Sequence, residues 1–212
     1  MLSESLRRDA PYIREETALL LVDMQRAWLE PGLNSAQPGR ELGDYFYREV
    51  WQRVIPNQRR LLKAARGAGI EVLYTIVRSL TRDGRDRSLD YKLTPLHLAP
   101  DDPYALPVSE LAPQNDEIVL PKTSSGVFNS TNLNYLLRNL GTRYLVVAGV
   151  MTDQCVDMAV RDAADLGYLV TCVSDACAAP TQERHENGLN TFSGYCWIAD
   201  TETVLARLDG LR

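Results

Sequence analysis

The chain has 212 residues, 45% of them hydrophobic, and a formal net charge of -5 at pH 7. Its 23 Lys and Arg residues are scattered, which argues against a nucleic-acid surface, and no apolar run approaches the roughly 18 residues of a membrane helix. We expect one domain over residues 1–212, with residues 1–15 as an N-terminal arm. Four cysteines and no signal peptide favour reduced thiols and a cytoplasmic protein with no nucleic-acid or membrane partner.

Strand and helix patterns alternate along the chain. The apolar run 17–22 predicts a buried strand that ends at Asp23, and helix formers over 41–69 predict a helix that Pro56 breaks or kinks. The later elements are a strand over 70–77, a long proline-rich loop over 79–113, a strand over 117–120 ended by Pro121, a helix over 131–140, strands over 143–150 and 168–173, helices over 153–166 and 182–192, and a last strand and helix over 196–208. This order predicts an α/β fold of three layers, α/β/α, around a mostly parallel, Rossmann-like doubly wound sheet.

Three polar residues follow three different predicted strands: Asp23, Lys122 and Cys155. Ligands bind outside the carboxyl ends of the strands in open parallel sheets, so we expect the three side chains to share one site. A nucleophile, a carboxylate and a cation are the groups that cysteine-dependent hydrolysis requires.

Cys155 is predicted in the first turn of a helix, directly after a buried strand. Free backbone N–H groups and the helix dipole favour a thiolate there, although free cysteine more often serves as a small buried hydrophobe. For the other three cysteines the sequence supports only packing in or near the core; these are Cys172, Cys177 and Cys196. Neither His97 nor His185 follows a strand, which argues against a Cys/His pair as the source of the base.

Three segments resemble the isochorismatase-like cysteine hydrolases. They are Ala18 to Gln25, Leu120 to Ser124 with Phe128 and Thr131 downstream, and Gly149 to Val156. The resemblance implies that Asp23, Lys122 and Cys155 form the family's catalytic triad. It also implies a cis peptide bond between Val150 and Met151, and an oxyanion hole made by the N–H groups of Met151 and Cys155.

The resemblance also bears on the reaction. The isochorismatase branch cleaves a vinyl ether without the cysteine, so Cys155 favours hydrolysis of a C–N bond through a thioester. Two alternatives stay open: a vinyl-ether hydrolase, and a non-catalytic binding module on the same fold. Nicotinamidases of the superfamily bind a metal through an Asp/His cluster after the second strand, and residues 75–80 contain neither residue type. We therefore expect no metal and no other cofactor.

The loop from Arg78 to Lys92 is similar to that of relatives that cleave ureides, which implies a small amide or ureide substrate. The guanidinium of Arg78 suits planar amides and carboxylates, whereas Arg82, Arg85 and Arg87 fit a solvated loop face. The other candidate substrate-binding residues are Gln25, Trp28, Asn129 and Tyr195. Aromatic residues over 44–55 favour a homo-oligomer, a dimer or tetramer, or else they cover the sheet.

Overall fold

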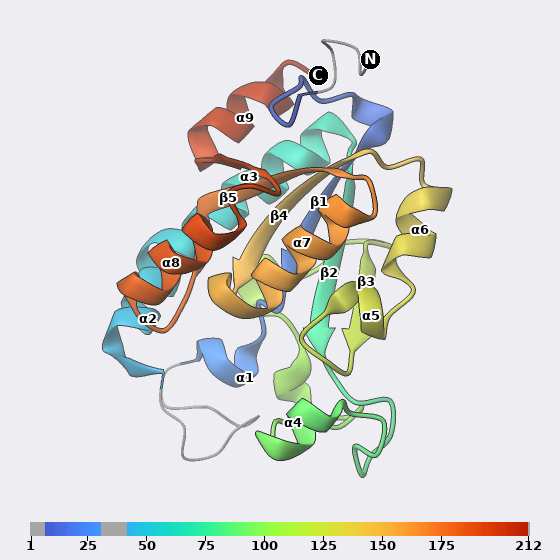
Figure 1. The fold of residues 1–212 in the computed structure, drawn as a ribbon, viewed down its shortest axis with the longest axis vertical. Coiled ribbons are helices and arrows are strands. Elements are labelled where there is room, and N and C mark those ends of the chain that lie inside the picture. Colours follow the sequence, from blue (N-terminus) through green and yellow to red (C-terminus); the bar gives the residue numbers. More distant parts are fainter. Residues whose placement is uncertain (1–6, 31–41, 212) are drawn as a thin grey trace.

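Six parallel strands form one sheet in the part of the chain described by the computed structural model, residues 7–30 and 42–211 (Figure 1). Their order is β3-β2-β1-β4-β5-β6, and their bounds are β1 Thr17–Val22, β2 Glu71–Val77, β3 Ile118–Lys122, β4 Tyr144–Val150, β5 Leu169–Ala178 and β6 Trp197–Ala199. This is the doubly wound order, and its switch point lies between β1 and β4. The predicted three-layer fold is confirmed.

Helices cover both faces of the sheet (Figure 1). In chain order they are α1 Arg26–Leu29, α2 Gly43–Glu49, α3 Ile55–Ala68, α4 Leu89–Leu93, α5 Val127–Ser130, α6 Leu133–Asn139, α7 Asp157–Asp165, α8 Gln182–Phe192 and α9 Thr201–Asp209. Side chains of α3 and α9 pack on one face, and side chains of α5, α6 and α7 pack on the other. No helix among the described residues is long and apolar enough to cross a membrane.

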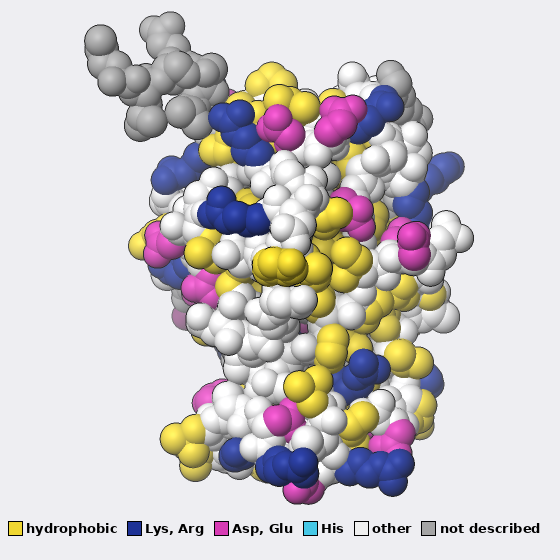
Figure 2. Space-filling view, turned by 90° about the vertical axis from the view of Figure 1, so that its right-hand side faces the viewer, with side chains coloured by type: hydrophobic (Ala, Val, Ile, Leu, Met, Phe, Trp, Pro, Cys, Tyr) yellow, Lys and Arg dark blue, Asp and Glu magenta, His cyan; other side chains and the backbone are white. Residues whose placement is uncertain are grey.

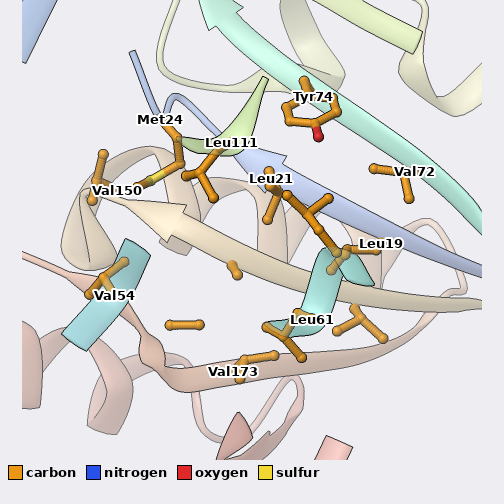
Figure 3. Packing of buried hydrophobic residues seen from close by; sticks show 14 of the residues in the cluster. Leu19, Leu21, Met24, Val54, Leu61, Val72, Tyr74, Leu111, Val150 and Val173 are labelled. Carbon is orange, nitrogen blue, oxygen red and sulfur yellow. The ribbon is translucent and has the colours of Figure 1, made fainter. Parts of the chain in front are cut away.

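β1 shows why this sheet requires cover on both sides. Successive side chains of a strand point to opposite faces, and every residue of β1 is buried. Leu19 and Leu21 face the cluster that contains Leu61 of α3 (Figure 3), whereas Leu20 and Val22 face the opposite cluster. The continuous apolar run of the sequence follows from this central position.

The helical segment before β2 runs on through Pro56. α2 is followed without a gap by a π-helical turn, Val50–Val54, and then by α3, whose second residue is Pro56. A proline has no N–H to donate to the preceding turn, and the wider turn accommodates this loss. The predicted break is therefore a change of helix type. Glu41, where the predicted helix began, lies outside the described residues.

Aromatic side chains of this segment serve the interior of the chain. Phe46 is fully buried in the core, and the Trp51 Nε1–H donates to the carbonyl of Leu29 at 2.7 Å. These contacts favour the interpretation that the aromatic residues cover the sheet. The oligomeric state stays a prediction.

Three element boundaries differ from those predicted. β3 does not end at Leu120 but continues through Pro121 to Lys122, which an edge strand tolerates because one side of its backbone is unpaired. The predicted helix 131–140 is the shorter α6, Leu133–Asn139, and a short helix that the sequence did not predict, α5, precedes it. β5 extends five residues past the predicted end to Ala178, after an irregularity in its register with β4.

The described part of the N-terminal arm, residues 7–15, packs against the domain. The Tyr12 side chain is buried, and its hydroxyl donates to Thr171 Oγ1 at 2.9 Å. Arg207 of α9 donates to the backbone carbonyls of Asp9 and Ala10. These contacts tie the arm to β5 and α9.

Candidate active site

The carboxyl ends of β1, β3 and β4 bring Asp23, Lys122 and Cys155 into contact. The Lys122 Nζ lies 2.9 Å from Asp23 Oδ2 and 3.3 Å from Cys155 Sγ. Asp23 directly follows β1, Lys122 is the last residue of β3, and Cys155 lies in the π-helical turn Thr152–Val156 between β4 and α7. The structure therefore assembles the three residues that the sequence placed at strand ends.

Gly149 permits the close approach of β4 to β1 at this point. Its φ is 140°, a region that side chains disfavour, and a Cβ there would lie 2.2 Å from the carbonyl oxygen of Val22. Val22 immediately precedes Asp23. Only glycine fits beside the strand end that carries the carboxylate.

Thr75 of β2 fixes the carboxylate of Asp23. Its hydroxyl donates to Asp23 Oδ1 at 2.7 Å, and its carbonyl accepts the Asp23 N–H at 3.1 Å. Asp23 Oδ2 is buried and lies 2.9 Å from Lys122 Nζ. One carboxylate oxygen is thus held by the scaffold, and the other faces the ammonium and the thiol.

Lys122 is fully buried and surrounded by acceptors. Its ammonium donates to the carbonyls of Ser124 and Ser125 at 2.9 and 3.3 Å, and it lies 3.2 Å from the hydroxyl of Tyr91. Burial lowers the pKa of Lys122, but the charges of Asp23 and Cys155 together have the larger effect, so the pKa is raised overall. The ammonium keeps its charge inside the protein.

Burial raises the pKa of the Cys155 thiol to about 11, although Lys122 acts in the opposite direction. The charge of Asp23 and its hydrogen bond to the thiol raise this pKa as well. The position at a helix start favoured a thiolate, and that expectation is wrong for the resting site. Burial raises the pKa of the thiol by more than the free N–H groups of the helix start lower it. At neutral pH the thiol is protonated and needs a base.

The turn that carries Cys155 is held by α8. Thr152 Oγ1 lies 2.8 Å from His185 Nδ1, and Arg184 Nε donates to Asp153 Oδ2 at 2.6 Å. Burial lowers the pKa of His185, which favours the neutral imidazole. The peptide bond that leads into the turn, Val150–Met151, is cis as expected.

A cavity of about 350 Å³ is lined by Asp23 and Cys155. This volume suits a small molecule. Its described lining consists of Asp23, Trp28, Leu42, Val77, Asp90, Tyr91, Thr94, Leu96, Ser125, Val150, Met151, Asp153, Gln154, Cys155, Asp157, Met158 and Pro180. Trp28 fits the predicted pocket wall, and its Nε1–H donates to the carbonyl of Asp23 at 2.8 Å, which leaves the ring as its contribution to the cavity.

The structure places the other four candidate substrate-binding residues outside the lining of this cavity. The Gln25 amide is fully buried, where it donates to the carbonyls of Val77 and Ala105 and accepts the Val77 N–H. Asn129 lies exposed on α5, and Tyr195 is 39% exposed beneath the guanidinium of Arg161. Arg78 follows β2 as predicted, but it is not among the lining residues.

The neighbouring arginines differ in role. Arg82 and Arg85 form exposed ion pairs with Asp101 and Asp83, as a solvated loop face would. Arg87 instead turns inward and donates to the carbonyls of Gly84 and Leu96. It organises the loop between β2 and β3.

Sequence reasoning missed Thr75, Tyr91 and His185. Thr75 left a signal, since it is a polar residue within the apolar strand 71–77 and its strand neighbours β1. Tyr91 comes from a long loop whose path no local pattern specifies. No local pattern indicates that His185 contacts the turn of Cys155, because it lies on a separate helix.

No cluster of three or more His, Cys, Asp or Glu side chains that could hold a metal ion occurs within residues 7–30 and 42–211. The side chains that meet at the triad are a carboxylate, an ammonium and a thiol.

The isochorismatase domain family matches residues 17–203. The chain belongs to the isochorismatase family. Among curated relatives, ureidoacrylate amidohydrolase of Serratia proteamaculans is 31% identical over 210 residues, which covers 89% of this chain and 81% of that protein. N-carbamoylsarcosine amidase of an Arthrobacter species is also 31% identical, over 71% of this chain and 55% of that protein.

One similar curated protein is named as inactive. A probable inactive nicotinamidase of Arabidopsis thaliana is 33% identical over 177 residues, 80% of this chain and 84% of that protein. Among solved structures, a cysteine hydrolase of Pseudomonas syringae pv. phaseolicola has a TM-score of 0.82 at 24% identity, with complete coverage of both chains. That likeness confirms the fold. An isochorismatase family protein of Desulfovibrio vulgaris has a TM-score of 0.76 at 28% identity, over 90% of this chain and 98% of its own.

Proposed function

We propose that this member of the isochorismatase family is an amidohydrolase that cleaves a C–N bond of a small amide or ureide through a thioester on Cys155. The observation that carries the proposal is the position of the Lys122 ammonium, 2.9 Å from Asp23 Oδ2 and 3.3 Å from Cys155 Sγ. Two of the similar curated proteins are named as a ureidoacrylate amidohydrolase and an N-carbamoylsarcosine amidase, which supports a ureide.

In the first half of the reaction, Asp23 takes the proton from the Cys155 thiol as the sulfur attacks the substrate carbonyl carbon. A base is required because the pKa of this thiol is raised to about 11. Lys122 stabilises the carboxylate before transfer and the sulfur as its negative charge develops. The N–H groups of Met151 and Cys155 are proposed to bind the carbonyl oxygen as it becomes an oxyanion.

In the second half, the tetrahedral adduct collapses and the C–N bond breaks. The leaving nitrogen takes the proton from Asp23, which regenerates the carboxylate and leaves a thioester. Asp23 then takes a proton from water as the water attacks the thioester carbonyl, and it returns that proton to the sulfur. The products are a carboxylic or carbamic acid and ammonia or an amine.

A substrate panel with matched variants tests this proposal. The purified full-length chain is assayed for ammonia release from small amides and ureides, and for pyruvate release from isochorismate. We expect ammonia release that Cys155→Ala abolishes and Cys196→Ala retains, since Cys196 is a buried cysteine outside the cavity. Circular dichroism checks that both variants fold. Full activity in Cys155→Ala, or pyruvate release alone, would contradict the mechanism.

A further inference from the structure

The charged side chains that line the cavity are all acidic. Four aspartates line it: Asp23, Asp90, Asp153 and Asp157. No lysine or arginine is among its lining residues in the described part of the chain. Lys122 lies fully buried, where its ammonium is engaged by Asp23, Cys155 and backbone carbonyls.

Three of these aspartates already have a cationic partner. Asp23 pairs with Lys122, Asp153 Oδ2 with Arg184 at 2.6 Å, and Asp157 Oδ1 with Arg161 at 2.5 Å. Asp153 Oδ1, in contrast, is buried and accepts no hydrogen bond from any described residue. The lining therefore keeps acceptor capacity even where its charge is balanced.

Asp90 is the aspartate whose carboxylate is free. It is exposed in the first turn of α4, and no ion pair or hydrogen bond joins its carboxylate to the described residues. Tyr91, the next residue, lines the same cavity, as does the ring of Trp28. A cavity lined by an unpaired carboxylate and aromatic rings favours a cation or N–H donors.

A substrate with a carboxylate would meet the opposite situation. It would lose hydration on entering the cavity, find no guanidinium or ammonium on the described walls, and approach the unpaired carboxylate of Asp90. Arg78, the residue that the sequence favoured for this task, is not among the lining residues. The lining therefore disfavours an anion.

We infer that the substrate carries no carboxylate, and that the end remote from the scissile bond is a cationic or neutral N–H-rich group bound by Asp90. This inference rests on the proposed function and refines its substrate class. Asp90 acts as a specificity residue, and Cys155 chemistry is the same for every substrate tested.

Three ureides with the same reacting end separate the possibilities: N-carbamoylglycine, which is anionic, its neutral primary amide, and the cationic (2-aminoethyl)urea. We expect kcat/KM for the amide and the amine to exceed that for the anion by about tenfold or more. Asp90→Asn should lower kcat/KM for the amine by roughly fivefold, the upper range for one exposed ion pair, and should not lower it for the anion.

Asp83→Asn is the matched control. It makes the same charge change in the same loop, but Asp83 pairs with Arg85 and does not line the cavity. For Asp83→Asn, the ratios of kcat/KM between the three ureides should stay within about twofold of the wild-type ratios. A similar loss in both variants would assign the effect to net charge and overturn the role of Asp90.

A binding measurement separates failure of this inference from failure of the proposed function. Thermal shifts of Cys155→Ala with each ureide report binding without turnover, and the amine and amide should stabilise the protein more than the anion does. N-carbamoylglycine as the best substrate or ligand would overturn the inference and leave the amidohydrolase proposal standing. Absence of ammonia release from every amide and ureide would overturn the proposed function, and with it this inference.

Discussion

Replacing Lys122 by Met should destabilise the protein strongly, because it leaves the carboxylate of Asp23 buried without its cation. The two side chains are 0% and 2% exposed and their charged atoms lie 2.9 Å apart. At an effective dielectric constant of about 20, two unit charges at that distance attract by about 6 kcal/mol. Part of this is offset by desolvation, and removing one partner of such a pair typically costs about 3–5 kcal/mol.

Urea unfolding at pH 7 measures this effect in a double-mutant cycle of Lys122→Met, Asp23→Asn and the combined variant. We expect Lys122→Met to lose about 3–5 kcal/mol, and the combined variant to recover most of that loss because no buried charge remains. Arg60→Met is the control, since Arg60 and Glu202 form an exposed pair worth at most about 1 kcal/mol. A Lys122→Met protein as stable as wild type, or a cycle without coupling, would refute this account of the buried pair.

Three further predictions concern the scaffold of the site. Gly149→Ala should lower the free energy of unfolding, measured in urea, by about 2–6 kcal/mol, because the backbone is strained and the new Cβ would lie 2.2 Å from the Val22 oxygen. Gly194→Ala is the control and should change this free energy little, because a Cβ there meets open space. Equal stabilities of the two variants would contradict the close approach at Gly149. Alkylation of Cys155 by iodoacetamide should rise about tenfold per pH unit from pH 8 to 10, because the thiol pKa is about 11, and a flat profile would indicate a preformed thiolate. His185→Ala should lower kcat roughly 10- to 100-fold with little change in KM, because the contact to Thr152 is lost. His185→Gln should recover part of the lost kcat. An unchanged kcat in His185→Ala would exclude a positioning role for His185.

The sequence predicted those features that depend on local pattern and strand order. Continuous apolar runs identified β1 and β4, and the alternation of strands and helices implied the parallel sheet. Since the carboxyl ends of parallel strands share one edge, Asp23 and Lys122 could be placed together before any distance was known. Their contact with Cys155 follows from the same geometry.

The features that escaped prediction depend on contacts between distant segments. Tyr91 reaches Lys122 from the long loop after β2, and His185 reaches Thr152 from α8. The ionisation of Cys155 also escaped, because a helix start favours the thiolate but burial, which no local pattern reveals, has the larger effect. The sequence also could not predict that the carboxylate of Asp90 is unpaired, because its loop alternates acidic and basic residues. Acidic and basic side chains are likewise interspersed on the face of the molecule shown in Figure 2.

Capture of the acyl-enzyme tests the central claim most directly. The wild-type protein is mixed with a ureide substrate, quenched in acid during turnover and digested, and the peptides are analysed by mass spectrometry. The account predicts a transient mass increase on the peptide that contains Cys155, equal to the acyl group of the substrate, and none in Cys155→Ala. Turnover with the acyl group on another residue, or ammonia release by Cys155→Ala at the wild-type rate, would contradict it.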